Sequence, residues 1–102
     1  MPSPAFSLYI VRCADGTLYT GIATDVQRRV EEHRAGTRGA KFLRGKEPLD
    51  VVFAEAVGDR ALAARLEYRV KQLNRQQKLD LVEGRLPLAT LADNQVLEEG
   101  SA

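Results

Sequence analysis

A β-hairpin centred on Asp15-Gly16 is the feature that most constrains the fold of this chain. The pair lies between two runs rich in β-branched and aromatic residues, 8–13 and 17–22. Such runs on both sides of an Asp-Gly pair are the strongest short signal for two antiparallel strands joined by a tight turn. We therefore expect these two runs to pair, and the rest of the chain to pack around them.

The length of the turn decides which side chains share a face of the hairpin. A two-residue turn would place Tyr9 and Tyr19 on opposite faces. A three-residue loop over 14–16, closed by a glycine in the left-handed conformation, pairs Cys13 with Thr17 and places both tyrosines on one face. This register also gathers an apolar set on the other face, so we predict it. The apolar set is Leu8, Ile10, Leu18 and Ile22.

A helix is predicted over about 25–35. Thr24 and Gln27 have the spacing of a capping box, with Thr24 as the N-cap. Within this helix Arg29 and His33 are four residues apart, which places them on one face, one turn above the other. By themselves these two residues are equally typical of an ordinary exposed helix surface.

The second half of the chain predicts one more strand and further helices. The apolar run 51–54 is typical of a strand buried on both faces. A helix follows over about 60–73, with leucine and valine recurring on one face, and shorter helical segments follow at 76–83 and 87–92. The sequence therefore predicts an α/β (α+β) domain with a three-stranded antiparallel sheet flanked by helices.

Length and composition predict a single domain. With 102 residues, 44% of them apolar, the chain can build one modest core. We assign this domain to residues 1–92, and we expect 93–102 to be a disordered tail because their apolar content is too low to pack. No membrane span or signal peptide is recognisable, so we expect a cytoplasmic protein. The lone Cys13 lies in a strand pattern, where a buried thiol is expected rather than a nucleophile.

Basic residues are concentrated in the body of the chain although the net charge is only +1. Residues 1–78 hold 14 of the 15 lysines and arginines but 9 of the 14 acids. A surface of this kind can follow nucleic-acid phosphates, although charge alone equally fits a solvated helix and loop. The candidate phosphate-binding residues are Arg28, Arg38, Lys41, Arg44, Lys46 and Lys71.

Several of these residues together resemble the GIY-YIG nuclease superfamily, and in particular its small standalone bacterial members, the YhbQ-like family. Ser7-Leu8-Tyr9 and Tyr19-Thr20-Gly21 resemble the two signature tripeptides in order and spacing. Arg29 and His33 resemble its catalytic helix, and Glu67 resembles its metal-binding glutamate. Ser7-Leu8 replaces the Gly-Ile of the family name, and Thr20 replaces the central isoleucine of the second tripeptide.

The resemblance implies phosphodiester hydrolysis with a divalent metal ion, Mg²⁺ or Mn²⁺, and no small-molecule cofactor. Glu67 would hold the metal, although a glutamate on a helix flank is by itself typical of a solvated surface. Tyr9 would act as general base, for which its pKa, near 10 when unperturbed, must be lowered by the metal or by Arg29. The resemblance further implies that Arg29 binds the scissile phosphate and that Tyr19 orients the water or Tyr9. His33 would be a hydrogen-bond partner or proton relay, and Gly21 and Asn74 would line the pocket.

The expected partner is DNA, with no membrane contact. The resemblance predicts an endonuclease that selects DNA by structure and takes part in repair or recombination. Two alternatives remain: a module that binds DNA structures without cutting them, and a domain that is basic because it contacts RNA. The sequence does not predict an oligomeric state.

Overall fold

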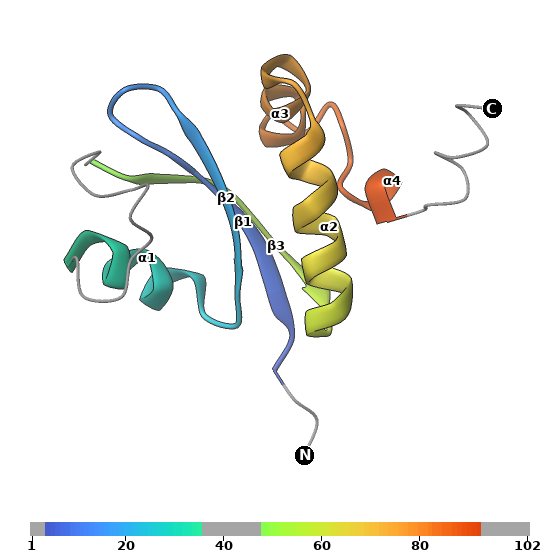
Figure 1. Cartoon of the computed structure of the whole chain (residues 1–102), viewed down its shortest axis with the longest axis horizontal. Helices are drawn as coiled ribbons and strands as arrows, with labels where there is room; N and C mark the ends of the chain where they lie inside the picture. Colours follow the sequence, from blue (N-terminus) through green and yellow to red (C-terminus); the bar gives the residue numbers. More distant parts are fainter. Residues whose placement is uncertain (1–3, 36–47, 93–102) are drawn as a thin grey trace.

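The computed structural model describes residues 4–35 and 48–92. Strands and helices follow one another along the chain as shown in Figure 1. In chain order the elements are β1 (Phe6–Arg12), β2 (Leu18–Ala23), α1 (Val26–Ala35), β3 (Asp50–Gly58), α2 (Arg60–Gln72), α3 (Arg75–Val82) and α4 (Ala89–Ala92).

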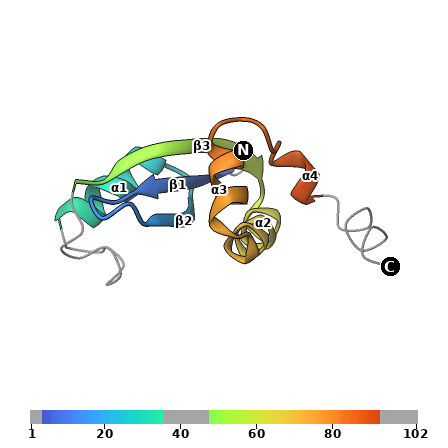
Figure 2. The same ribbon diagram turned by 90° about the horizontal axis from the view of Figure 1, so that it is seen from above.

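The sheet has three antiparallel strands in the order β2-β1-β3, so β1 is central and is paired on both sides. Helix α1 lies on one side of the sheet and α2 on the other; α3 lies at the end of α2, and α4 lies beside α2 (Figures 1 and 2). The predicted three-stranded antiparallel sheet flanked by helices is confirmed.

The hairpin has the predicted three-residue loop. The Cys13 amide donates to the Thr17 carbonyl over 2.9 Å, and the Gly16 amide donates to the Cys13 carbonyl over 2.9 Å. Gly16 has a φ of 87°, a conformation that a side chain would disfavour. In the resulting register Tyr9 lies opposite Gly21 and Val11 lies opposite Tyr19, so the two tyrosines share one face of the hairpin, as predicted.

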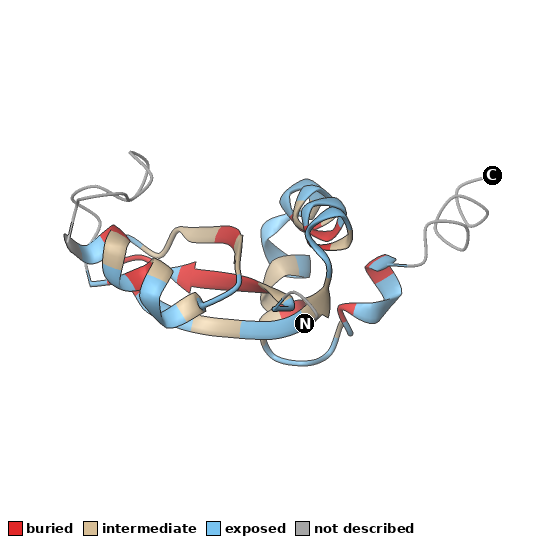
Figure 3. Cartoon of the chain, turned by 90° about the horizontal axis from the view of Figure 1, so that it is seen from below, coloured by how far each residue is buried: buried red, intermediate tan, exposed pale blue. Residues whose placement is uncertain are grey.

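Each face of the sheet carries its own apolar core, because side chains alternate along the central strand. Tyr9 and Val11 point toward α1, whereas Leu8 and Ile10 point toward α2. These four residues of β1 are almost fully buried. Figure 3 shows the burial along the central strand. The buried α1-side core is Tyr9, Val11, Cys13, Val30 and Leu49; the buried α2-side core is Leu8, Ile10, Leu66, Val70, Leu81, Leu88 and Leu91.

The prediction that the third strand is buried on both faces is wrong. β3 is an edge strand, on which Val51 is 41% exposed and Ala54 is also exposed. Val52 and Phe53 are half-buried and pack against the α2-side core. An apolar run does not reveal whether its strand lies at the centre or the edge of a sheet, because that depends on strand order.

The predicted helices after β3 are confirmed. Asp59 caps α2 by accepting a hydrogen bond from the Leu62 amide over 2.8 Å. The cap of α1 differs by one residue from the prediction, because Asp25 rather than Thr24 accepts from the Arg28 amide, over 3.1 Å. Within the described residues, no helix is both long enough and apolar enough to cross a membrane.

Gly21 provides the first testable prediction. A Cβ at Gly21 would lie 2.6 Å from the Cζ and Oη atoms of Tyr9, closer than atoms can approach. Gly21→Ala should therefore displace the buried Tyr9 ring and lower the free energy of unfolding by about 1–3 kcal/mol. Urea denaturation of Gly21→Ala, Tyr9→Leu and the double variant measures this effect. Leucine lacks the ring atoms that would clash with the new Cβ, so Gly21→Ala should lower the free energy of unfolding less when Tyr9 is already leucine. Additive losses in the double variant would contradict this explanation.

Candidate active site

Tyr9 is the centre of a buried polar cluster between β1, β2 and α1. Its side chain is only 1% exposed, and its ring passes over Gly21, where no side chain opposes it. The Tyr9 hydroxyl lies 3.3 Å from Nε2 of His33, which comes from the last turn of α1. The predicted partners from the first strand and the following helix are therefore in hydrogen-bond contact.

Burial raises the pKa of Tyr9 to about 12. Burial is the largest cause of this net shift. The nearby Tyr19 and Glu67 also raise the pKa, whereas Arg29 lowers it through its charge and a side-chain hydrogen bond. Arg29 thus acts in the direction expected from the sequence, but the loss of hydration is the larger effect. The protein alone therefore keeps Tyr9 as a neutral phenol at pH 7. Of the two groups expected to lower its pKa, Arg29 alone does not bring it below its usual value, and the metal stays a prediction.

His33 is also buried, with 4% of its surface exposed. The edge of its ring meets Tyr19, with ring centroids 5.8 Å apart and planes at 74°. Burial and the positive charge of Arg29 lower the pKa of His33, and the Glu32 carboxylate opposes them. At pH 7 the cluster therefore pairs a neutral imidazole with a neutral phenol.

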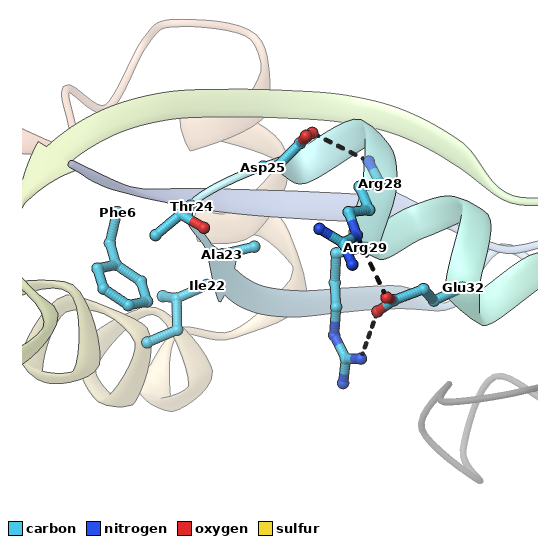
Figure 4. A pocket seen from close by; sticks show the side chains of 8 residues that line it. All are labelled: Phe6, Ile22, Ala23, Thr24, Asp25, Arg28, Arg29 and Glu32. Atoms are coloured by element: carbon cyan, nitrogen blue, oxygen red, sulfur yellow. Dashed lines mark hydrogen bonds and ion pairs between the residues drawn. The ribbon is translucent and has the colours of Figure 1, made fainter. Parts of the chain in front are cut away.

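Arg29 connects this buried cluster to the surface. Its guanidinium hydrogen-bonds the Tyr9 side chain and is also 3.1 Å from Oε1 of Glu32. Arg29 and Glu32 line an open hollow whose volume is about 320 Å³. Figure 4 shows the side chains that line it. The other residues that line the hollow are Phe6, Ile22, Ala23, Thr24, Asp25 and Arg28.

Sequence reasoning did not identify Glu32 as a member of the site. This carboxylate pairs with Arg29 and also with Arg28, whose Nε lies 3.7 Å from Oε2. The spacings of three and four residues along one helix could have indicated both pairs. Arg28 and Arg29 thus reach the same carboxylate, and both line the hollow (Figure 4).

Glu67 projects from α2 close enough for its charge to raise the pKa of Tyr9. Its side chain is 25% exposed, and its Oε2 lies 3.4 Å from Nζ of Lys71. Such an exposed pair one helical turn apart is weak, so the carboxylate can exchange the ammonium group for another cation. Three or more His, Cys, Asp or Glu side chains in one metal-binding group do not occur within 4–35 and 48–92. A single carboxylate fits Mg²⁺, which keeps several waters and takes further ligands from phosphate.

The other predicted binding residues are Asn74 and four candidate phosphate-binding residues. Asn74 caps α3: its side chain accepts from the Gln77 amide over 2.8 Å, and the Gln77 side chain accepts from the Asn74 amide. Asn74 thus has a structural role, and its assignment as a pocket residue stays a prediction. Four candidate phosphate-binding residues lie outside the described residues: Arg38, Lys41, Arg44 and Lys46.

The titration of His33 tests this electrostatic description. The chain has one histidine, so a single imidazole signal in an NMR titration reports it. We expect a midpoint below the usual 6.5 because burial and Arg29 disfavour the charged form. Arg29→Ala should raise this midpoint, whereas Glu32→Gln should lower it further. A parent midpoint at or above 6.5 would contradict the description.

The same shift predicts a pH dependence of stability. The unfolded imidazole binds its proton at a higher pH than the folded one, so the unfolded chain takes up more protons below about pH 6.5. The free energy of unfolding should therefore fall as the pH is lowered through this range, and His33→Gln should make the dependence shallower. Urea denaturation at a series of pH values measures both.

Comparison with known proteins identifies the family. Residues 5–80 match the family model described as the GIY-YIG catalytic domain. The chain is 60% identical over 75 residues to UPF0213 protein YhbQ of Escherichia coli K12, with 74% of each chain covered. It is 58% identical over 78 residues to UPF0213 protein YhbQ of Salmonella typhimurium, covering 76% of this chain and 77% of the relative.

Two solution NMR structures have a similar fold. UPF0213 protein BH0048 of Bacillus halodurans aligns with a TM-score of 0.51 and 38% identity, covering 88% of this chain and 95% of the other. Protein EF2693 of E. faecalis aligns with a TM-score of 0.58 and 32% identity, covering 80% and 86%. The chain therefore belongs to the GIY-YIG catalytic-domain family, and its relatives place it among the UPF0213 proteins of that family.

Proposed function

We propose that this protein is a divalent-metal-dependent DNA endonuclease whose active site is the cluster of Tyr9, Arg29 and His33 together with Glu67. Membership of a nuclease superfamily supports the reaction class. The observation that carries the proposal is the buried contact between the Tyr9 hydroxyl and His33, with Arg29 reaching from it to the surface. Tyr19, which contacts the His33 ring, completes the site.

The physical cost of this cluster supports a catalytic role. A buried phenol and a buried imidazole beside a partly exposed guanidinium are less favourable than apolar side chains of similar size, because polar groups lose hydration on burial. Here the cost is large enough to raise the pKa of Tyr9 to about 12 and to lower that of His33. Strongly shifted pKa values in one cluster are typical of sites that transfer protons.

The residues of the chain suggest the proton path. A water attacking the phosphorus atom gives its proton to the Tyr9 hydroxyl oxygen, while the Tyr9 proton passes to Nε2 of His33, 3.3 Å away. The P–O bond to the leaving sugar breaks in the same step, and the leaving oxygen takes a proton from solvent water. This path uses the neutral imidazole, whose Nε2 accepts the proton. Arg29 faces the negative charge that develops on the phosphoryl oxygens and neutralises part of it.

Glu67 would hold the divalent metal ion, Mg²⁺ or Mn²⁺. When bound, the ion supplies positive charge that neutralises phosphate oxygens and lowers the pKa values of nearby water and phenol groups. The negative charge of Glu67 raises the pKa of Tyr9. A cation bound to Glu67 would instead lower that pKa, which supports Glu67 as the metal ligand. Lys71, which pairs with this carboxylate in the unbound protein, would have to leave it for a metal ion to bind.

We further propose that the enzyme selects DNA by structure and acts in repair or recombination. The candidate DNA-contacting side chains are arginines and lysines, which hold the phosphate backbone without identifying a base sequence by themselves. Nicked and branched molecules are the DNA structures that arise in these processes.

Cleavage assays test the function directly. Linear, nicked and branched DNA should be incubated with the parent and with Tyr9→Phe, with and without Mg²⁺. We expect Mg²⁺-dependent cutting by the parent and strong loss in Tyr9→Phe, which lacks the hydroxyl. Binding without any cutting would instead support the non-catalytic DNA- or RNA-binding module.

Arg29→Ala and Glu67→Gln should separate catalysis from binding. Arg29→Ala should lower the turnover number by about 10²–10³, the scale expected for one well-placed electrostatic donor, with a smaller effect on DNA affinity. Glu67→Gln keeps the size of the side chain but removes the charge that attracts the metal. Cleavage should collapse and recover little at high Mg²⁺, whereas metal-free DNA affinity should hold or increase. Single-turnover cleavage and binding titrations measure these quantities.

Arg85→Ala is the matched control for removing an arginine. Arg85 pairs with Asp80 and Glu83 after α3, outside the Tyr9 cluster, so its removal should leave cleavage unchanged. Cleavage by Glu67→Gln at the parent rate would contradict the metal assignment.

A further inference from the structure

The outer side of α2 carries an exposed aromatic ring. Tyr68 is 67% exposed, and among the described residues Val51 is the only other large hydrophobic side chain that is exposed. Leu66 and Val70 of the same helix are buried against the sheet. Tyr68 follows Leu66 by two residues, about 200° around the helix, so it points into solvent. Figure 3 shows exposed residues on the side of this helix that faces away from the sheet.

The two helices α2 and α3 are strongly basic. Between residues 60 and 82 the acids are only Glu67 and Asp80, whose carboxylates pair with Lys71 and Arg85. This segment therefore has a net charge of +4, six bases against two acids, although the whole chain has +1. The six basic residues are Arg60, Arg65, Arg69, Lys71, Arg75 and Lys78.

Two of these cations flank the exposed ring. Arg65 and Lys71 lie three residues before and after Tyr68, which makes them its neighbours on the helix surface. Both are exposed. Glu67 directly precedes Tyr68, about 100° around the helix, so the ring and the candidate metal-binding carboxylate lie on adjacent flanks of α2.

We propose that Tyr68, with Arg65 and Lys71, docks a single-stranded segment of nucleic acid that leads away from the active site. An exposed aromatic ring between cations matches what an unpaired strand offers, a base to stack and phosphates to neutralise. A continuous duplex has its bases stacked internally, so it offers the ring no free base. The positive charge of the helices favours a polyanion over an apolar protein partner. This inference rests on the proposed function for its placement beside the site of cleavage.

The docking surface refines the class of substrate. A nick, flap or branch can present unpaired nucleotides to α2 while its phosphate backbone reaches Arg29. Lys71 links the docking surface to the candidate metal site, because it contacts Glu67 in the unbound protein and lies three residues after Tyr68 on the helix. Movement of Lys71 to a phosphate of the docked strand would leave the Glu67 carboxylate available for a metal ion.

The test is the affinity for single strands in the absence of metal. The probe is an oligothymidylate of about twelve nucleotides, bound in EDTA by the parent and by variants of the whole chain. Tyr68→Ala should weaken binding on the order of tenfold, because one base loses its stacking partner. Tyr68→Phe should bind as the parent does, because the ring is kept. Val51→Ala is the control for removing an exposed apolar side chain from the far edge strand, and it should change nothing.

Two further readouts separate stacking from charge. Arg65→Ala should reduce the slope of log affinity against log salt by about 0.7, whereas Tyr68→Ala should leave that slope unchanged. The chain has three tyrosines and no tryptophan, so tyrosine emission can report the ring directly. Oligothymidylate should quench this emission in the parent more than in Tyr68→Phe.

The outcomes of this test are independent of cleavage. Equal affinity of Tyr68→Ala and the parent would overturn the docking surface, even if the parent cuts DNA as proposed. Absence of oligothymidylate binding by the parent would overturn it as well. Weakened binding by Tyr68→Ala, together with intact binding by Tyr68→Phe, would support it even if the parent cut no DNA.

Discussion

The register of the β1–β2 hairpin is the constraint on which the structure depends. The three-residue loop, closed by Gly16 at a φ of 87°, sets Tyr9 opposite Gly21 and sends Leu8 and Ile10 to the other face. A slip of one residue would exchange the two faces, because side chains alternate along a strand. It would place a phenol against α2 and leucine against α1, so the α2-side core and the polar cluster would be lost together.

The buried cluster shows two opposing electrostatic effects. Burial disfavours ionised Tyr9 and protonated His33, whereas Arg29 favours the phenolate but also disfavours the imidazolium. Both residues are therefore neutral at pH 7 in the protein alone. A second cation beside Tyr9 would lower its pKa, as Arg29 does. Glu67 is near enough to Tyr9 to hold such a cation there.

The sequence predicted the features that depend on local pattern. The hairpin loop, the helices and the alternation of Tyr9 with Leu8 follow from turn chemistry and from periods of 2 and 3.6 residues. It failed where a feature depends on tertiary placement. Strand order made β3 an edge, and burial rather than sequence spacing set the pKa of Tyr9. The cap of α1 moved from Thr24 to Asp25 because two adjacent residues could both serve, and local pattern does not choose between them.

Helix α2 shows how a short chain can combine a core with a reactive site. Its inner stripe, with Leu66 and Val70, is buried and holds the helix against the sheet. Glu67 lies at the border of that stripe, where it is partly covered but can still reach solvent and a cation. Because the inner stripe fixes the rotation of the helix, the packing of leucine and valine determines where the carboxylate lies relative to Tyr9. The core residues of α2 therefore help to place the charge of Glu67 where it changes the pKa of Tyr9, a residue of the sheet.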